Sequence, residues 1–234
     1  MKNLNKASSY YILKSRDTRF NFIILIVLFA VLSFALFKGA LGDKSEAEII
    51  LILYILILGT TILMANSMIV DLTVKDKLKG RIELFLGSGI KLEELVQAYG
   101  FQMLRLSSLV PFLIFMVFYY FIDFSYSFIL VVLIYLTTVA LAYAEIYFLN
   151  VFSFMAKNNK LFKNIIFFGS FLLIYLSGMF SEEIIGFFND MKLDLLYVIL
   201  ALNVIVAGSL FVFAKQKLKK LTNEKIVQGK GEWA

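Results

Sequence analysis

The sequence predicts an all-α, polytopic membrane protein with six transmembrane helices, an N-terminal interfacial helix and a cytoplasmic helix between spans two and three. Three observations favour this class: 61% of the 234 residues are hydrophobic, only 17% are charged, and the mean hydropathy is +0.85. Soluble domains carry about 45–50% apolar and about 25% charged residues. A globule of this length cannot bury the excess. A soluble enzyme is therefore excluded, and so is a disordered chain.

Two residue types are missing from the chain: it has no histidine and no cysteine. Histidine is the side chain whose unperturbed pKa lies near neutrality, and cysteine supplies thiolate nucleophiles and soft metal ligands. We therefore expect a chain that is not an enzyme, with no catalytic residue, no metal site and no bound cofactor. It would act by binding, by moving a cargo or by being moved.

The first element is an amphipathic interfacial helix over residues 1–19. Tyr10, Tyr11, Ile12 and Leu13 stand there between flanking cations, as in helices that lie in the membrane interface. An unstructured basic arm is the alternative. A cleavable signal peptide is not favoured, because the following apolar segment is full length and no small-residue cleavage site follows it.

The transmembrane domain follows over residues 20–214. About 20 apolar residues in a helix cross the hydrocarbon core, and six segments meet or approach that length. They are Phe20–Leu41, Glu48–Val70, Gln97–Phe121, Phe128–Phe154, Ile165–Phe180 and Leu195–Ala214. The fifth is short, and we expect its outer end to continue into an outer re-entrant segment over residues 181–194. Residues 215–234 form a basic cytoplasmic tail.

Lys and Arg residues predict the orientation, because cytoplasmic connections are enriched in them. Of the 23 in the chain, only Lys38, Lys44 and Lys192 fall on the other side. Both termini are therefore expected in the cytoplasm of a multi-pass protein of the cell membrane. The net charge of +6 does not indicate a nucleic-acid partner, because the cations lie at membrane boundaries, where they attract anionic membrane lipids.

The long cytoplasmic connection over residues 71–96 is predicted to contain one amphipathic helix. Its apolar residues recur at three- and four-residue spacing and so share a face: Val74, Leu78, Ile82, Phe85 and Leu86. Gly87-Ser88-Gly89 then breaks the helix. An apolar ridge of this kind can fill a groove on a soluble partner or lie on the lipid surface, and the spacing alone favours neither.

The same connection resembles that of type-2 ATP-binding-cassette (ABC) exporter permeases. The resemblance is carried by Asp76-x-x-x-Gly80-Arg81-Ile82-Glu83-x-x-Leu86-x-Ser88-x-Ile90. Arg81 stands where these permeases commonly have threonine, Gly89 where they have proline, and Asp76 where they have glutamate. The basic interfacial helix, the six spans and the outer segment between spans five and six also agree with their layout.

The resemblance implies that this helix is a coupling helix that docks on a separate cytoplasmic ABC ATPase subunit. The docking residues it implies are Val74, Asp76, Leu78, Gly80, Ile82, Glu83, Phe85 and Leu86. The chain has no G-x-x-x-x-G-K-[ST] phosphate-binding loop, so ATP would be bound and hydrolysed on the partner chain. It also implies a dimer, either with a second permease copy or with a sister permease.

Two charged residues lie far from the ends of predicted spans: Arg105 in the third and Glu145 in the fourth. Both stand at a similar depth from the cytoplasmic ends of adjacent antiparallel helices, at about 1.5 Å per residue. We expect them to face each other. The pair either locks the two helices together, which is the favoured interpretation, or lets Glu145 bind a cationic part of a cargo.

The favoured function is the permease subunit of an ATP-driven exporter of an amphipathic peptide, such as an antimicrobial peptide, or of a drug or lipid-like cargo. The alternative is a stand-alone membrane immunity protein that sequesters a toxin without ATP. A secondary transporter that works through Glu145 is disfavoured, because the chain has one buried acid and no internal repeat.

Overall fold

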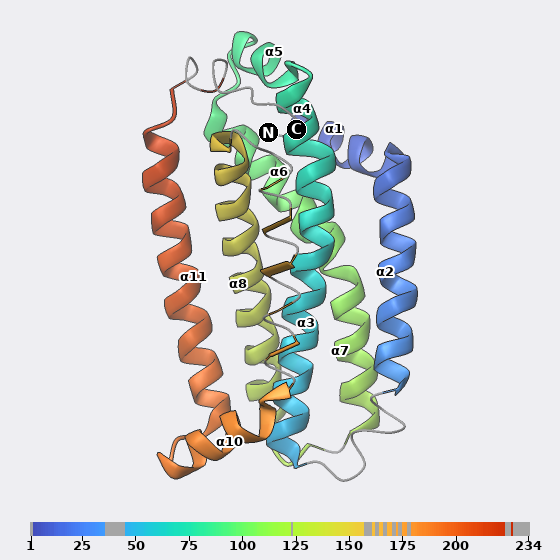
Figure 1. Cartoon of the computed structure of the whole chain (residues 1–234), viewed down its shortest axis with the longest axis vertical. Helices are drawn as coiled ribbons and strands as arrows, with labels where there is room; N and C mark the ends of the chain where they lie inside the picture. Colours follow the sequence, from blue (N-terminus) through green and yellow to red (C-terminus); the bar gives the residue numbers. More distant parts are fainter. Residues whose placement is uncertain are drawn as a thin grey trace.

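The computed structural model describes residues 2–35, 45–122, 124–156, 161, 164–165, 168–169, 172, 175–176, 179–222 and 226. Within these ranges the regular structure is helical throughout. The long helices run side by side, and two shorter helices lie across opposite ends of the bundle (Figure 1). The all-α prediction is thus confirmed for the described residues.

Four helices are long and apolar enough to cross a membrane. They are Glu46–Leu78, Leu92–Phe121, Phe128–Met155 and Leu195–Lys219, with 33, 30, 28 and 25 residues. About 20 residues are needed, so the chain is a multi-pass helical membrane protein. Helix α2 (Arg16–Ala35) has 20 residues and lies alongside them. Half of the fifth predicted span, Ile165–Phe180, and the end of the first lie outside the described residues.

Helix α8 (Phe128–Met155) is at the centre of the packing. It contacts α3 (Glu46–Ile69), α6 (Leu92–Ser107) and α11 (Leu195–Lys219), and α3 also packs on α2, α6 and α7 (Leu109–Phe121). The main apolar core lies between these helices. Its fully buried residues include Met64, Met68, Leu95, Met103 and Val151.

Three of the long helices begin at residues whose side chains cap them. Ser45 and Glu48 form a capping box at the start of α3, in which the Ser45 hydroxyl accepts the Glu48 N–H and the Glu48 carboxylate accepts the Ser45 N–H. Ser127 caps α8, and Asp194 caps α11. These caps satisfy backbone donors that would otherwise lack partners at the start of each helix.

The helix over Leu92–Phe121 is interrupted at Ser108, between α6 and α7. Pro111 has no N–H for the Ser107 carbonyl, and its ring crowds that carbonyl, so the regular bonding pattern ends there. The sequence predicted one continuous span over Gln97–Phe121. In the structure this span starts at Leu92 and consists of two helices.

Two short helices lie across the ends of the bundle. Helix α1 (Lys2–Lys14) contacts α6, and the chain turns at Ser15 into α2. At the other end, α10 (Ser181–Asp190) packs Ile184, Ile185 and Phe188 against α3 and α11. Residues 181–190, expected within a re-entrant segment, thus form a helix that lies across the bundle end (Figure 1).

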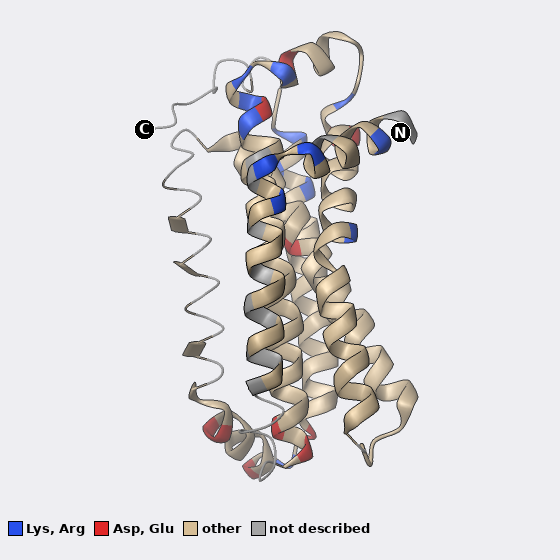
Figure 2. Cartoon of the chain, turned by 90° about the vertical axis from the view of Figure 1, so that its right-hand side faces the viewer, with Lys and Arg blue, Asp and Glu red and all other residues tan. Residues whose placement is uncertain are grey.

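The charges separate between the two ends (Figure 2). Lys and Arg residues gather at the end that carries α1, called here the basic end. Carboxylates gather at the end that carries α10, called here the acidic end. Glu46 bonds Ser125 and the Tyr126 N–H there, which ties the start of α3 to the turn before α8. Burial, followed by the carboxylates of Asp194 and Glu46, raises the pKa of the Tyr126 hydroxyl.

Candidate functional site

The candidate site is the connecting segment, residues 70–91, which joins α3 to α6 at the basic end. Helix α3 continues beyond the predicted end at Val70, through the π-helical turn η2 (Val70–Val74) and into α4 (Lys75–Leu78). Gly80 then ends the helix with a φ of 70°, a backbone conformation that favours glycine. Helix α5 follows over Arg81–Gly87. The single helix predicted from Val74 to Leu86 is therefore wrong, because Gly80 divides it in two.

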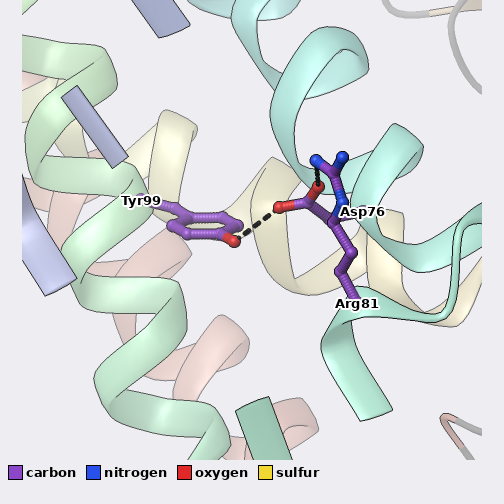
Figure 3. A network of polar contacts seen from close by, with 3 residues as sticks. All are labelled: Asp76, Arg81 and Tyr99. Carbon is purple, nitrogen blue, oxygen red and sulfur yellow. Dashed lines mark hydrogen bonds and ion pairs between the residues drawn. The ribbon is translucent and has the colours of Figure 1, made fainter. Parts of the chain in front are cut away.

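A buried carboxylate holds the connecting segment to α6 (Figure 3). Asp76 on α4 is only 3% exposed. One of its oxygens accepts the Tyr99 hydroxyl of α6 at 2.8 Å, and the other accepts the Arg81 guanidinium of α5 at 3.1 Å. A buried charge is costly unless it is paired and hydrogen-bonded. The three residues satisfy this requirement together, and they tie α4, α5 and α6 to one another.

The neighbouring residue Lys77 is buried as well, and it holds the segment to α8. Its Nζ donates to the carbonyls of Ser153 at 3.2 Å and Ala156 at 2.6 Å. The last carbonyls of a helix lack partners within the helix and carry partial negative charge. Lys77 therefore caps the end of α8 from a different helix.

Thr73, one helical turn before Lys77, makes a third polar link. Its hydroxyl donates to the Asn150 side-chain carbonyl of α8 at 2.6 Å. The Asn150 amide in turn donates to the Ile146 carbonyl at 3.0 Å and contacts the Met103 sulfur of α6 at 3.3 Å. Thr73 and Lys77 are four residues apart and so reach the same neighbour from one helix face.

These links make the connecting segment a rigid extension of the bundle. The sequence singles out Asp76 but not Thr73, Lys77 or Tyr99. The one sequence signal that could have pointed to Thr73 and Lys77 as contacts of α8 is their four-residue spacing among apolar residues. Tyr99 lies 23 residues after Asp76, and nothing in the local pattern joins the two.

The structure buries three of the eight predicted docking residues and leaves the other five half-buried. Val74, Asp76 and Ile82 are buried, with Ile82 only 1% exposed. Phe85 and Leu86 are partly buried and pack on the main core. Leu78, Gly80 and Glu83 are half-buried. Most of the apolar ridge therefore packs on the molecule's own core, and the docking of a partner on these eight residues stays a prediction.

The face that α5 presents outward is a different set of residues. Leu84 is a large apolar side chain, yet it is 73% exposed. It lies on α5, a short helix outside the bundle. Gly87, Ser88 and Gly89 at the end of α5 are exposed too. Gly89, with a φ of 86°, forms the turn that follows α5, as Gly80 forms the turn that precedes it. We call Leu84 and residues 87–89 the outer face of α5.

The two charged residues predicted inside the spans are not bonded to each other. Arg105 is exposed on α6, Glu145 is half-buried on α8, and among the described residues the structure records no ion pair between them. Their pairing stays a prediction. The Glu145 carboxylate interacts electrostatically with the Tyr54 hydroxyl of α3.

A polar network joins three helices deeper in the bundle. The Tyr54 hydroxyl of α3 donates to the Asn203 carbonyl of α11 at 2.9 Å. The Asn203 amide donates to the hydroxyls of Thr137 and Thr138 on α8 at 3.1 and 3.3 Å. Asn203 and Asn150 thus both form hydrogen bonds between helices, as polar residues within membrane spans commonly do.

Among the residues that the structure describes, no three His, Cys, Asp or Glu side chains form a group that could hold a metal ion. Comparisons of the chain with protein-family models, with curated proteins and with solved structures find no match. The resemblance to exporter permeases accordingly stays a prediction from the residues that carry it.

Proposed function

We propose that this chain is the permease subunit of an ATP-driven exporter, and that a separate cytoplasmic ATPase acts on it through the outer face of α5. The observation that carries the proposal is the set of polar links from Thr73, Asp76 and Lys77 to α6 and α8. A surface that is held this firmly to membrane-crossing helices can transmit a partner's motion to them.

The exposure of Leu84 supports the same proposal. An isolated exposed leucine is unremarkable, but this one lies in the middle of a short helix, one turn before three small exposed residues. A short helix of this kind can enter a groove on a soluble protein. The proposal thus keeps the connecting segment as the coupling element and moves its contact residues from the buried ridge to the outer face.

The remaining parts of the proposal concern topology and assembly. We propose six spans with both termini in the cytoplasm, which agrees with the gathering of Lys and Arg at the basic end. ATP is bound by the ATPase, and two permease chains, identical or sister, form the pathway. The cargo is an amphipathic peptide, a drug or a lipid-like molecule.

Co-purification tests the proposal directly. The tagged chain is solubilised gently from its native membrane and examined for a soluble ATPase, in the natural form and as Leu84→Asp. We expect the ATPase with the natural chain and its loss with the variant. The matched control is Leu193→Asp, because Leu193 is also exposed (47%) but lies between α10 and α11, at the acidic end. Ile82→Asp is unsuitable, since a buried aspartate there would unfold the segment.

Two results would contradict the proposal. No ATPase with the natural chain, under conditions that keep it folded, would favour the stand-alone immunity protein. An ATPase that remains bound to a folded Leu84→Asp chain would exclude the outer face of α5 as its docking surface.

A further inference from the structure

We propose that α1 and the start of α2 form a binding surface for anionic phospholipid headgroups at the basic end of the molecule. This surface is separate from the outer face of α5, and it does not depend on the proposed exporter function. The partner is the membrane itself.

Helix α1 has two opposite faces. Leu4, Ser8 and Ile12 recur every four residues and form the inner face, and Ser8 and Ile12 are buried against the bundle. Tyr10 and Leu13 lie on the opposite face and are exposed. Because α1 lies across the bundle end (Figure 1) and Tyr10 and Leu13 are exposed, that outer face is directed away from the core.

Cations surround these two exposed apolar residues. Lys6 and Lys14 lie on α1, and Arg16 and Arg19 lie on the first turn of α2; all four are exposed. In the part of the chain that the structure describes, no carboxylate forms an ion pair with any of the four. The Lys14 ammonium lies 5.5 Å above the Tyr10 ring, so its alkyl chain follows the aromatic side chain while its charge stays at the surface.

This combination is the pattern of a helix that lies in the membrane interface. Apolar side chains enter the boundary of the acyl chains, and cations at their edge meet lipid phosphates. A soluble acidic protein would match the cations but not the adjoining Tyr10 and Leu13. The anionic bilayer surface matches both.

The surface also has a structural connection to the candidate site. The inner face of α1 packs on η2 and on α6, the two elements that carry Thr73 and Tyr99. A headgroup that holds α1 in place would thus stabilise the position of the connecting segment.

Spin-labelled lipids test this proposal with the purified full chain in phosphatidylcholine vesicles. The fraction of motionally restricted label is compared between phosphatidylglycerol and phosphatidylcholine probes. We expect a preference for phosphatidylglycerol on the order of fivefold, since each cation near the surface attracts anionic lipid. The preference should collapse in about 1 M salt, where the screening length is ~3 Å.

Two fourfold variants locate the surface. The first is Lys6→Gln, Lys14→Gln, Arg16→Gln and Arg19→Gln, which should lose the preference. The matched control changes the four lysines at the same end of α11, namely Lys215→Gln, Lys217→Gln, Lys219→Gln and Lys220→Gln, and should keep most of it. Retention of the preference in the first variant, or equal loss in both, would overturn the proposal.

A second measurement tests the proposal even if the chain with the four changes in α1 and α2 cannot be reconstituted into vesicles. The chain has no cysteine, so Leu13→Cys can carry a single fluorophore in an otherwise natural chain. Nitroxide lipids labelled near the headgroup should quench it more strongly than they quench the same label at Leu193→Cys in phosphatidylglycerol-containing vesicles. Equal quenching at both positions would place the outer face of α1 away from the lipid and would overturn the proposal.

Discussion

At the scale of single residues, the connecting segment depends on charges that are buried and fully bonded. Asp76 would be unfavourable in its position without Tyr99 and Arg81, and Lys77 would be unfavourable without the carbonyls at the end of α8. Each of the two charges joins a different neighbouring helix to the segment. Their contribution is therefore to position the segment, and the loss of a single partner should be costly.

Tyr99→Phe measures one of these bonds. The substitution removes the hydroxyl and leaves one oxygen of a buried carboxylate without its donor. We expect the free energy of unfolding to fall by about 1.5–3 kcal/mol, as for hydrogen bonds to charged groups. Reversible denaturation of the purified protein in micelles measures it. Tyr120→Phe is the control, because Tyr120 is 82% exposed, and it should change stability by no more than about 0.5 kcal/mol.

At the scale of elements, the division of the connecting segment into α4 and α5 depends on Gly80. Its positive φ reverses the chain after α4 and allows Ile82 to enter the core while Leu84 points outward. Without this turn α4 would continue as one helix away from the bundle, and the Arg81 guanidinium could not bond the Asp76 carboxylate.

Gly80→Ala tests this role. An L-residue in the left-handed conformation costs roughly 1–2 kcal/mol, so we expect a loss of stability of that size. The control lies in the same segment: Gly87 is helical, and an added Cβ meets no atom within 4 Å. Gly87→Ala should be neutral or stabilise by up to ~1 kcal/mol. Thermal unfolding in one detergent compares the two, and equal losses would contradict the assigned role of Gly80.

Much of the bundle could be predicted from the sequence because apolar runs of about 20 residues have few alternative structures. The ends of the helices and the burial of polar residues could not. The spacing of Val74, Leu78 and Ile82 predicted one face of one helix, but the turn at Gly80 ends α4 and places Ile82 on α5. Periodicity also does not say what a face contacts, and both Val74 and Ile82 are buried in the molecule. Only tertiary structure brings Tyr99 to Asp76 and the end of α8 to Lys77.

At the scale of the whole molecule, the separation of charge between the two ends predicts its orientation in the membrane (Figure 2). The basic end, with the connecting segment, should face the cytoplasm, and the acidic end, with α10, should face outward. In that orientation the outer face of α5 is accessible to a cytoplasmic protein.

Single cysteines test the orientation, since the natural chain has none. In intact cells a membrane-impermeant maleimide should label Leu193→Cys and should not label Leu84→Cys until the cells are made permeable. Both residues are exposed in the structure, so a difference in labelling reports the side of the membrane. Labelling of Leu84→Cys but not of Leu193→Cys in intact cells would show the opposite orientation and would exclude a cytoplasmic partner for α5.

The uninterrupted course of α3 through η2 and α4 has a further consequence for mechanics. Its 33 residues extend about 50 Å at ~1.5 Å per residue, whereas the hydrocarbon core is about 30 Å thick. The helix is therefore about 20 Å longer than the hydrocarbon core, which lets it act as a lever across a membrane. Pivoting by about 5° around its midpoint displaces each end by roughly 2 Å, so a push at one end moves the other end by a similar distance.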